Sequence, residues 1–209
     1  WVDRNGNGAQ DADEPSVGDF QLMKDMGVNA IRYYIPVTRD AKYDPSQVNK
    51  ELFRDLYERY GIRVIAGDFL GAYTVGSGAH WELGTDYKDP RQLEFMREVV
   101  RQKVLDLRGE PWLLMWLLGN ENNMKPTWTG VNATRTNAGS EPEAWAEFLN
   151  EIAEMIHELD PDHPVAVGNL DLGLADVYGR LAPAVDVFGI NAYRGPNGFG
   201  NLWAEAHAQ

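Results

Sequence analysis

The sequence has 209 residues, of which 44% are hydrophobic and 11% aromatic, so it predicts one domain with a filled core and excludes a disordered chain. Its 19 Lys and Arg residues are outnumbered by 32 Asp and Glu residues, and the formal charge of −13 disfavours nucleic acid and anionic membrane surfaces as partners. The absence of cysteine excludes disulfides, thiolate zinc sites and thiol catalysis, and the four histidines have no metal-ligand spacing.

The first motif along the chain is a twelve-residue segment, 3–14, that fits the calcium-loop pattern. Oxygen-bearing side chains fill positions 1, 3, 5, 9 and 12 of the pattern, with glycine at position 6; they are Asp3, Asn5, Asn7, Asp11 and Glu14. Loops rich in Asp, Asn and Gly are also common turns. Two interpretations therefore stay open, a structural calcium site and a plain turn, and no cofactor is predicted for catalysis.

Helical and extended patterns alternate along the rest of the chain. Apolar residues at helical spacing predict helices over 17–26, 52–60, 90–107, 142–159 and 172–181, and the start of another over 202–208. Runs of β-branched and aromatic residues predict strands over 28–37, 62–69, 112–119, 165–169 and 185–193. Ser140 and Glu143 have the spacing of a capping box for the helix over 142–159.

Alternating βα units with almost continuously apolar strands are typical of the open doubly wound sheet and of the (β/α)8 TIM barrel. A dinucleotide-binding sheet needs a glycine-rich turn directly after its first strand, and this sequence has none there. A barrel carries polar site residues at the C-terminal ends of its strands, and all five predicted strands end in this way. We therefore predict an α/β fold, a single incomplete TIM barrel over residues 1–209.

The third predicted strand ends in Gly119-Asn120-Glu121-Asn122. A carboxyl group at a barrel mouth, beside amides that can bind sugar hydroxyls and against apolar walls, has the setting of a general acid. The same glutamate could simply cap the strand. Residue types and spacing leave both interpretations open.

Four further residues are candidates for substrate binding. Asp68, at the end of the second strand, is expected to bind a sugar hydroxyl, to orient Arg32 or to form a salt bridge. His80 and Trp81 lie in a long loop after that strand and could form a stacking wall for a pyranose ring or a cluster that holds the loop down. Trp128, in the next loop, has the same two interpretations.

The segment MWLLGNEN, residues 115–122, resembles the acid/base segment of the clan A retaining glycoside hydrolases, which are (β/α)8 barrels, and most of all their family 2 catalytic domains. It is also similar to the corresponding segment of β-1,3-glucanosyltransferases. GVNAIRYY, GIRVIAGDF and FGINAYRG resemble the second, third and sixth strands of the same clan, in the same order. The resemblance implies that the barrel in this chain lacks its first strand and its seventh and eighth units.

The resemblance implies a role for each matching residue. Glu121 corresponds to the general acid/base and Asn120 to the amide that holds the sugar 2-hydroxyl. Arg32 is expected to place a positive charge near the nucleophile, and Asn191 and Tyr193 to line the floor of the site. Without the resemblance, two structural interpretations explain these residues equally well: a buried ion pair for Arg32 and a half-buried core position for Tyr193.

The clan's nucleophile, a second glutamate that ends the seventh strand, has no counterpart here, because the other glutamates lie in predicted loops and helices. We therefore expect the nucleophile beyond residue 209 and the 209-residue chain alone to be inactive. The predicted function is a retaining glycosidase, secreted or periplasmic in a bacterium, that acts on β-linked oligo- or polysaccharides. The alternatives are a transglycosidase, a non-catalytic carbohydrate-binding barrel and a calcium-stabilised interaction domain, and the oligomeric state is unknown.

Overall fold

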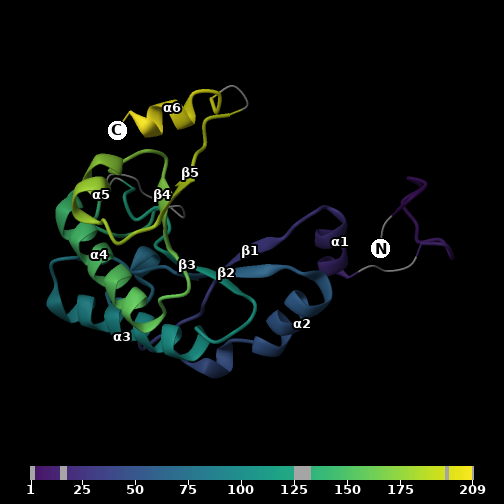
Figure 1. Ribbon diagram of the computed structural model, residues 1–209, viewed down its shortest axis with the longest axis horizontal. Helices are drawn as coiled ribbons and strands as arrows, with labels where there is room; N and C mark the ends of the chain where they lie inside the picture. The colour runs from purple at the N-terminus through teal and green to yellow at the C-terminus, as the bar shows by residue number, and fades with distance from the viewer. Residues whose placement is uncertain (1–2, 15–17, 125–132, 196–197, 209) are drawn as a thin grey trace.

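The computed structural model describes residues 3–14, 18–124, 133–195 and 198–208, and its centre is one parallel sheet of five strands (Figure 1). The strands lie side by side in chain order, and each pairs with the next: β1 (Ala30–Tyr34), β2 (Arg63–Asp68), β3 (Leu113–Leu118), β4 (Val165–Leu170) and β5 (Val187–Asn191). A doubly wound sheet reverses its strand order at a switch point, and this sheet does not. The order is the one that a barrel predicts.

Helices alternate with the strands, and α2 to α5 lie along one side of the sheet (Figure 1). The elements are α1 (Asp19–Asp25), α2 (Lys50–Tyr60), α3 (Pro90–Leu107), α4 (Pro142–Leu159), α5 (Ala175–Leu181) and α6 (Leu202–His207), with short 3-10 turns η1 (Pro45–Gln47) and η2 (Ala72–Thr74). Every predicted helix is present. The predicted start at Val17 lies outside the described residues.

The core fills the space between the sheet and these helices. Val64, Trp116 and Val167 project from β2, β3 and β4 into the same cluster as buried residues of α2, α3 and α4, among them Leu56, Val104 and Ile152. In β1, Ile31 and Tyr33 pack against this cluster, so the alternating residues Arg32 and Tyr34 lie on the opposite face of the sheet. That face carries the site. No helix in the described part of the chain is long and apolar enough to cross a membrane.

The start of α4 corrects one prediction. The N-cap residue is Glu141, whose side chain makes no capping hydrogen bond, and the Ser140 hydroxyl donates instead to the carbonyl of Asn137 at 3.0 Å. Pro142 occupies the first helical position, where its fixed φ suits the helix. The helix therefore begins one residue too late for a capping box from Ser140.

Candidate active site

Glu121 lies directly after β3 and is almost fully buried, at 6% exposure. Its backbone N–H donates to the carbonyl of Gly168 in β4 at 2.7 Å, and its φ of 56° is in the left-handed region. On the other side of the strand end, the N–H of Gly119 donates to the carbonyl of Asp68 in β2 at 2.8 Å. The turn is thus fastened to both neighbouring strands.

Two side chains from the end of β5 hold the Glu121 carboxylate. The Tyr193 hydroxyl donates to Oε1 at 2.8 Å and the Asn191 amide donates to the same oxygen at 3.0 Å. The hydrogen bonds of the described residues to this carboxylate both end on Oε1, and none ends on Oε2. One carboxylate oxygen is therefore anchored, while the other accepts no hydrogen bond from the described residues.

Hydrogen bonds join the remaining predicted residues of the clan motif to this carboxylate. The amide of Asn191 also donates to Oδ1 of Asn120 at 3.3 Å, and its own carbonyl oxygen accepts from the Arg32 guanidinium at 3.4 Å. The structure therefore brings together five predicted residues from the ends of β1, β3 and β5: Arg32, Asn120, Glu121, Asn191 and Tyr193.

Two tyrosines that the sequence analysis did not select belong to the same network. The Tyr34 hydroxyl donates to the carbonyl of Gly119 at 2.8 Å, and its ring is stacked on Phe69 with centroids 4.1 Å apart. The Tyr73 hydroxyl accepts from the amide of Asn120 at 3.1 Å. Tyr34 could have been found, since it shares the face of Arg32 two residues before it. The sequence places Tyr73 near His80 and Trp81, in the loop of the candidate stacking wall, but gives no signal for its hydrogen bond with Asn120, because the path of the loop depends on tertiary structure.

The pKa values of two phenols of the site are raised, for different reasons. Burial raises the pKa of Tyr34 to about 12, so this hydroxyl is a neutral donor at physiological pH. The pKa of Tyr193 is raised chiefly by its hydrogen bond to Glu121, although its ring is 79% exposed. Tyr193 therefore reports on the position of the carboxylate.

Asp68 does not join this cluster. Its carboxylate forms a buried ion pair with Lys103 of α3, with 2.6 Å between Oδ2 and Nζ, and Oδ1 accepts from the backbone N–H of Leu70 at 2.6 Å. Lys103 also donates to the carbonyl of Ile35 at 2.8 Å. Of the three roles expected for Asp68, the structure shows the salt bridge, and its partner is a lysine 35 positions away in the sequence. The carboxylate does not pair with Arg32.

His80 and Trp81 lie in the loop between η2 and α3. The Trp81 ring is 40% exposed and has the guanidinium of Arg135 5.1 Å from its centroid, while the exposed His80 ring accepts from the N–H of Glu82 at 3.4 Å. Neither side chain hydrogen bonds with Glu121 or Asn120 in the described part of the chain. Trp128 lies outside the described residues.

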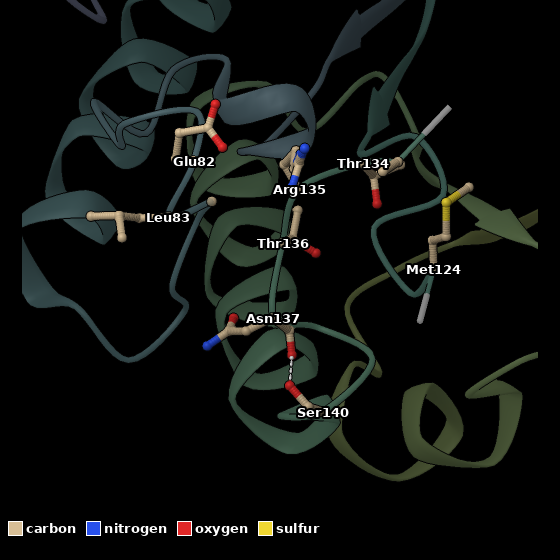
Figure 2. A pocket seen from close by; sticks show the side chains of 10 residues that line it. Glu82, Leu83, Met124, Thr134, Arg135, Thr136, Asn137 and Ser140 are labelled. Atoms are coloured by element: carbon tan, nitrogen blue, oxygen red, sulfur yellow. Dashed lines mark hydrogen bonds between the residues drawn. The ribbon is translucent and has the colours of Figure 1, made fainter. Parts of the chain in front are cut away.

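A cavity of about 260 Å³ opens between this loop and the loop before α4. Figure 2 shows the segment 134–137 in the middle of the view, with Glu82 and Leu83 on one side and Met124 on the other. The N–H of Met124 donates to the carbonyl of Glu121 at 2.9 Å, so the cavity wall continues into the turn that carries Glu121. The cavity thus adjoins the candidate active site without containing its carboxylate.

The predicted calcium loop is closed on itself. The amides of Asn5 and Asn7 donate to the same oxygen of Asp11 at 2.7 and 2.8 Å, and the carboxylates of Asp3 and Glu14 accept from backbone N–H groups of the loop. Among the residues that the structure describes, no group of three or more His, Cys, Asp or Glu side chains is placed to hold a metal ion. Calcium binding by this loop stays a prediction.

Comparison with known proteins finds one matching family. A profile described as "Glycosyl hydrolases family 2, TIM barrel domain" matches residues 2–195. A search of curated proteins gives no match.

Several solved structures have a similar fold. An exo-beta-1,4-mannosidase from Opitutaceae bacterium strain TAV5 is 21% identical with a TM-score of 0.61, covering 82% of this chain and 33% of that one. A beta-1,4-D-mannanase from Cryptopygus antarcticus is 17% identical with a TM-score of 0.56, covering 82% and 58%. A calcium binding mutant of Bacteroides uniformis beta-glucuronidase 2 is 18% identical with a TM-score of 0.59, covering 91% and 20%.

These likenesses, together with the strand order, confirm the predicted fold as part of a TIM barrel. The chain spans about a third of the length of the mannosidase and less than two thirds of the mannanase.

Proposed function

The chain belongs to the TIM barrel domain family of the family 2 glycosyl hydrolases, and on that premise we propose that it supplies the general acid/base half of a retaining glycosidase for β-linked oligo- or polysaccharides. The observation that carries the proposal is the state of the Glu121 carboxylate. Two donors, at the end of β5 and just after it, fix Oε1, and Oε2 accepts no hydrogen bond from the described residues. A general acid needs this combination of a fixed orientation and an oxygen that is not already used by the protein.

In the proposed reaction Glu121 gives its proton to the glycosidic oxygen as the bond to the sugar breaks, and then takes a proton from the water that attacks the glycosyl-enzyme intermediate. Asn120 holds the sugar 2-hydroxyl, a contact that strengthens in the oxocarbenium-like transition state. Tyr73 supports this role, because its hydroxyl fixes the orientation of the Asn120 amide. Arg32 adds positive charge on the same face.

The nucleophile of a retaining enzyme is a second carboxylate about 5–5.5 Å from the first. We propose that it lies outside these 209 residues, on the barrel strand that follows β5. In the described part of the chain, no carboxylate is hydrogen-bonded into the Glu121 network. The complete reaction therefore needs the longer protein.

The experiment uses the complete barrel that contains this chain and a panel of aryl β-glycosides. The panel includes mannosides and glucuronides, because the similar solved structures include a mannosidase, a mannanase and a glucuronidase. We expect Glu121→Gln to lower kcat by a factor of about 10²–10⁴, the usual contribution of a general acid or base. Glu158→Gln, a change at the solvent-facing end of α4, is the control and is expected to leave kcat unchanged.

A second arm separates the acid/base role from loss of structure. With a reactive aryl leaving group that needs no acid, Glu121→Ala with added azide should form a β-glycosyl azide, since azide replaces the water that the carboxylate activates. Full activity of Glu121→Gln would contradict the proposal. A wild-type barrel that binds oligosaccharide and cleaves none of the panel would favour the carbohydrate-binding alternative.

A further inference from the structure

The turn that carries Glu121 has an unusual backbone. Gly119 and Glu121 both have positive φ, 73° and 56°. Glycine adopts this region freely, but a glutamate rarely does, because its Cβ approaches the backbone carbonyl. The surrounding structure must therefore hold Glu121 in this conformation.

Asn122 is the side chain best placed to hold it. It is 1% exposed, and its Oδ1 accepts from the backbone N–H of Asn120 at 2.7 Å, inside the turn itself. Its amide nitrogen donates to the carbonyls of Phe69 and Leu70 after β2, at 3.2 and 3.1 Å, and to the Tyr87 hydroxyl at 2.7 Å. One buried amide thus joins the catalytic turn to the end of the neighbouring strand.

The hydroxyl that receives Asn122 is itself fixed. Tyr87 is 2% exposed, donates to the carbonyl of Leu70 at 2.7 Å, and packs its ring 4.7 Å from that of Trp145 in α4. Burial raises the pKa of Tyr87, so its hydroxyl stays protonated and can serve as both acceptor and donor. Through Tyr87, the Asn122 side chain is therefore held by a contact with helix α4.

The glycine of the turn fits this arrangement. A Cβ at Gly119 would lie 2.6 Å from Oδ1 of Asn122, closer than real Cβ contacts come. The Asn122 amide therefore occupies the space that the missing side chain leaves. Isosteric Asp cannot replace it, because a carboxylate has no N–H for the two carbonyls and the hydroxyl.

We propose that Asn122 is a positioning residue for Glu121: its side chain holds the 119–121 turn in the left-handed conformation that directs the carboxylate to Tyr193 and Asn191. The consequence for catalysis rests on the proposed function, but the positioning itself does not. Asn122 does not touch the carboxylate and acts through the backbone of Asn120.

The test uses the complete barrel that contains this chain and follows the Tyr193 phenol by NMR of tyrosine ring carbons, with Tyr193→Phe to assign the signal. The hydrogen bond to Glu121 raises the Tyr193 pKa in the wild type, so displacement of the carboxylate should lower that pKa towards the ordinary value of about 10. Glu121→Gln gives the reference for complete loss of the charge. We expect Asn122→Ala to move the Tyr193 pKa in the same direction.

The matched control is Asn123→Ala. Asn123 is the next residue and is also buried, at 8% exposure. Its side-chain amide makes three hydrogen bonds, but these go to Leu170, the last residue of β4, and to Gly173, and not to the 119–121 turn. It should lose comparable stability and leave the Tyr193 pKa unchanged.

Tyr87→Phe removes a single anchor of Asn122 and serves as the milder variant if Asn122→Ala does not fold. A smaller decrease of the Tyr193 pKa is expected. The proposal is overturned if the folded Asn122 or Tyr87 variants keep the wild-type Tyr193 titration, or if Asn123→Ala changes it equally. None of these readouts needs hydrolysis, so a failure of the proposed function would be seen separately.

Discussion

At the scale of single residues, Tyr34 links two strand ends. Its side chain extends from β1 over the neighbouring strand β2, and its hydroxyl donates to the carbonyl of Gly119, the first residue of the 119–121 turn. A Cβ at Gly67 in β2 would lie 2.7 Å from its ring, so the glycine makes room for the tyrosine to pass. A phenol and a glycine on adjacent strands therefore support the turn together.

The Tyr34 phenol gives stability a defined pH dependence. Its pKa of about 12 in the folded state exceeds the ordinary 10, so the folded state binds this proton more tightly than the unfolded state. Stability should therefore fall as pH rises from about 10 to about 12. At pH 8, Tyr34→Phe should lower the free energy of unfolding by about 1 kcal/mol, because the hydrogen bond is lost. Between about pH 10 and pH 12, the free energy of unfolding of this variant should fall less than that of the wild type.

Urea denaturation of both proteins between pH 8 and pH 11.5 checks this expectation. Parallel loss of stability in the two proteins would show that Tyr34 does not contribute to the pH dependence.

The ion pair of Asp68 and Lys103 is the second prediction at this scale. Lys103→Met leaves a buried carboxylate without its partner and should cost about 3–5 kcal/mol. The double variant with Asp68→Asn should recover much of this loss. Arg59→Met, which breaks the exposed pair with Asp55, is the control and should cost less than about 1 kcal/mol. Chemical denaturation measures all three changes.

At the scale of elements, two loops hold each other beside the site. The N–H of Thr85 donates to the carbonyl of Arg135 at 2.8 Å, and the N–H of Asn137 donates back to the carbonyl of Thr85 at 3.0 Å. The Thr136 hydroxyl continues the link to the carbonyl of Asn122 at 2.7 Å. The loop after η2 and the loop before α4 therefore form walls of a cavity and also stabilise the turn that carries Glu121.

The loop over 3–14 carries the calcium prediction. The hydrogen bond from Gly8 lowers the pKa of Asp3, so this carboxylate is ionised at neutral pH. If the loop binds calcium, millimolar Ca²⁺ should raise Tm, because a ligand that binds only the folded state stabilises it. Asp11→Asn, at a ligand position, should weaken the response, whereas Asp13→Asn, at a position without a ligand role, should not.

Differential scanning calorimetry with calcium and with magnesium measures the response. An identical Tm with and without calcium would favour the plain turn.

At the scale of the whole molecule, the sheet is open. Within the described residues, β1 and β5 each pair with one strand only, and apolar side chains near β5 are exposed: Val187 is 38%, Phe199 50% and Trp203 65% exposed. Unpaired strand edges and apolar patches favour association.

We therefore expect the 209-residue chain, expressed alone, to self-associate, to bind a hydrophobic dye and to hydrolyse none of the aryl glycosides. Light scattering, dye fluorescence and the glycoside panel measure these properties. A monodisperse monomer that melts cooperatively at high temperature would contradict the first expectation, and turnover that depends on Glu121 would contradict the last.

The sequence alone determined the order of helices and strands, the polar strand ends and the position of Glu121, because periodicity, glycine and proline act locally. Strand lengths were overestimated, as at β1, since only pairing with a neighbour fixes where a strand ends. The tertiary structure alone decided the partner of Asp68, 35 positions away, and the contact of Tyr34 with a carbonyl 85 positions away. The sequence predicted Asn122 only as an amide beside Glu121 that could bind a sugar hydroxyl. Its hydrogen bonds to the residues after β2 and to Tyr87 were decided by the tertiary structure, because they depend on distant backbone that no local pattern contains.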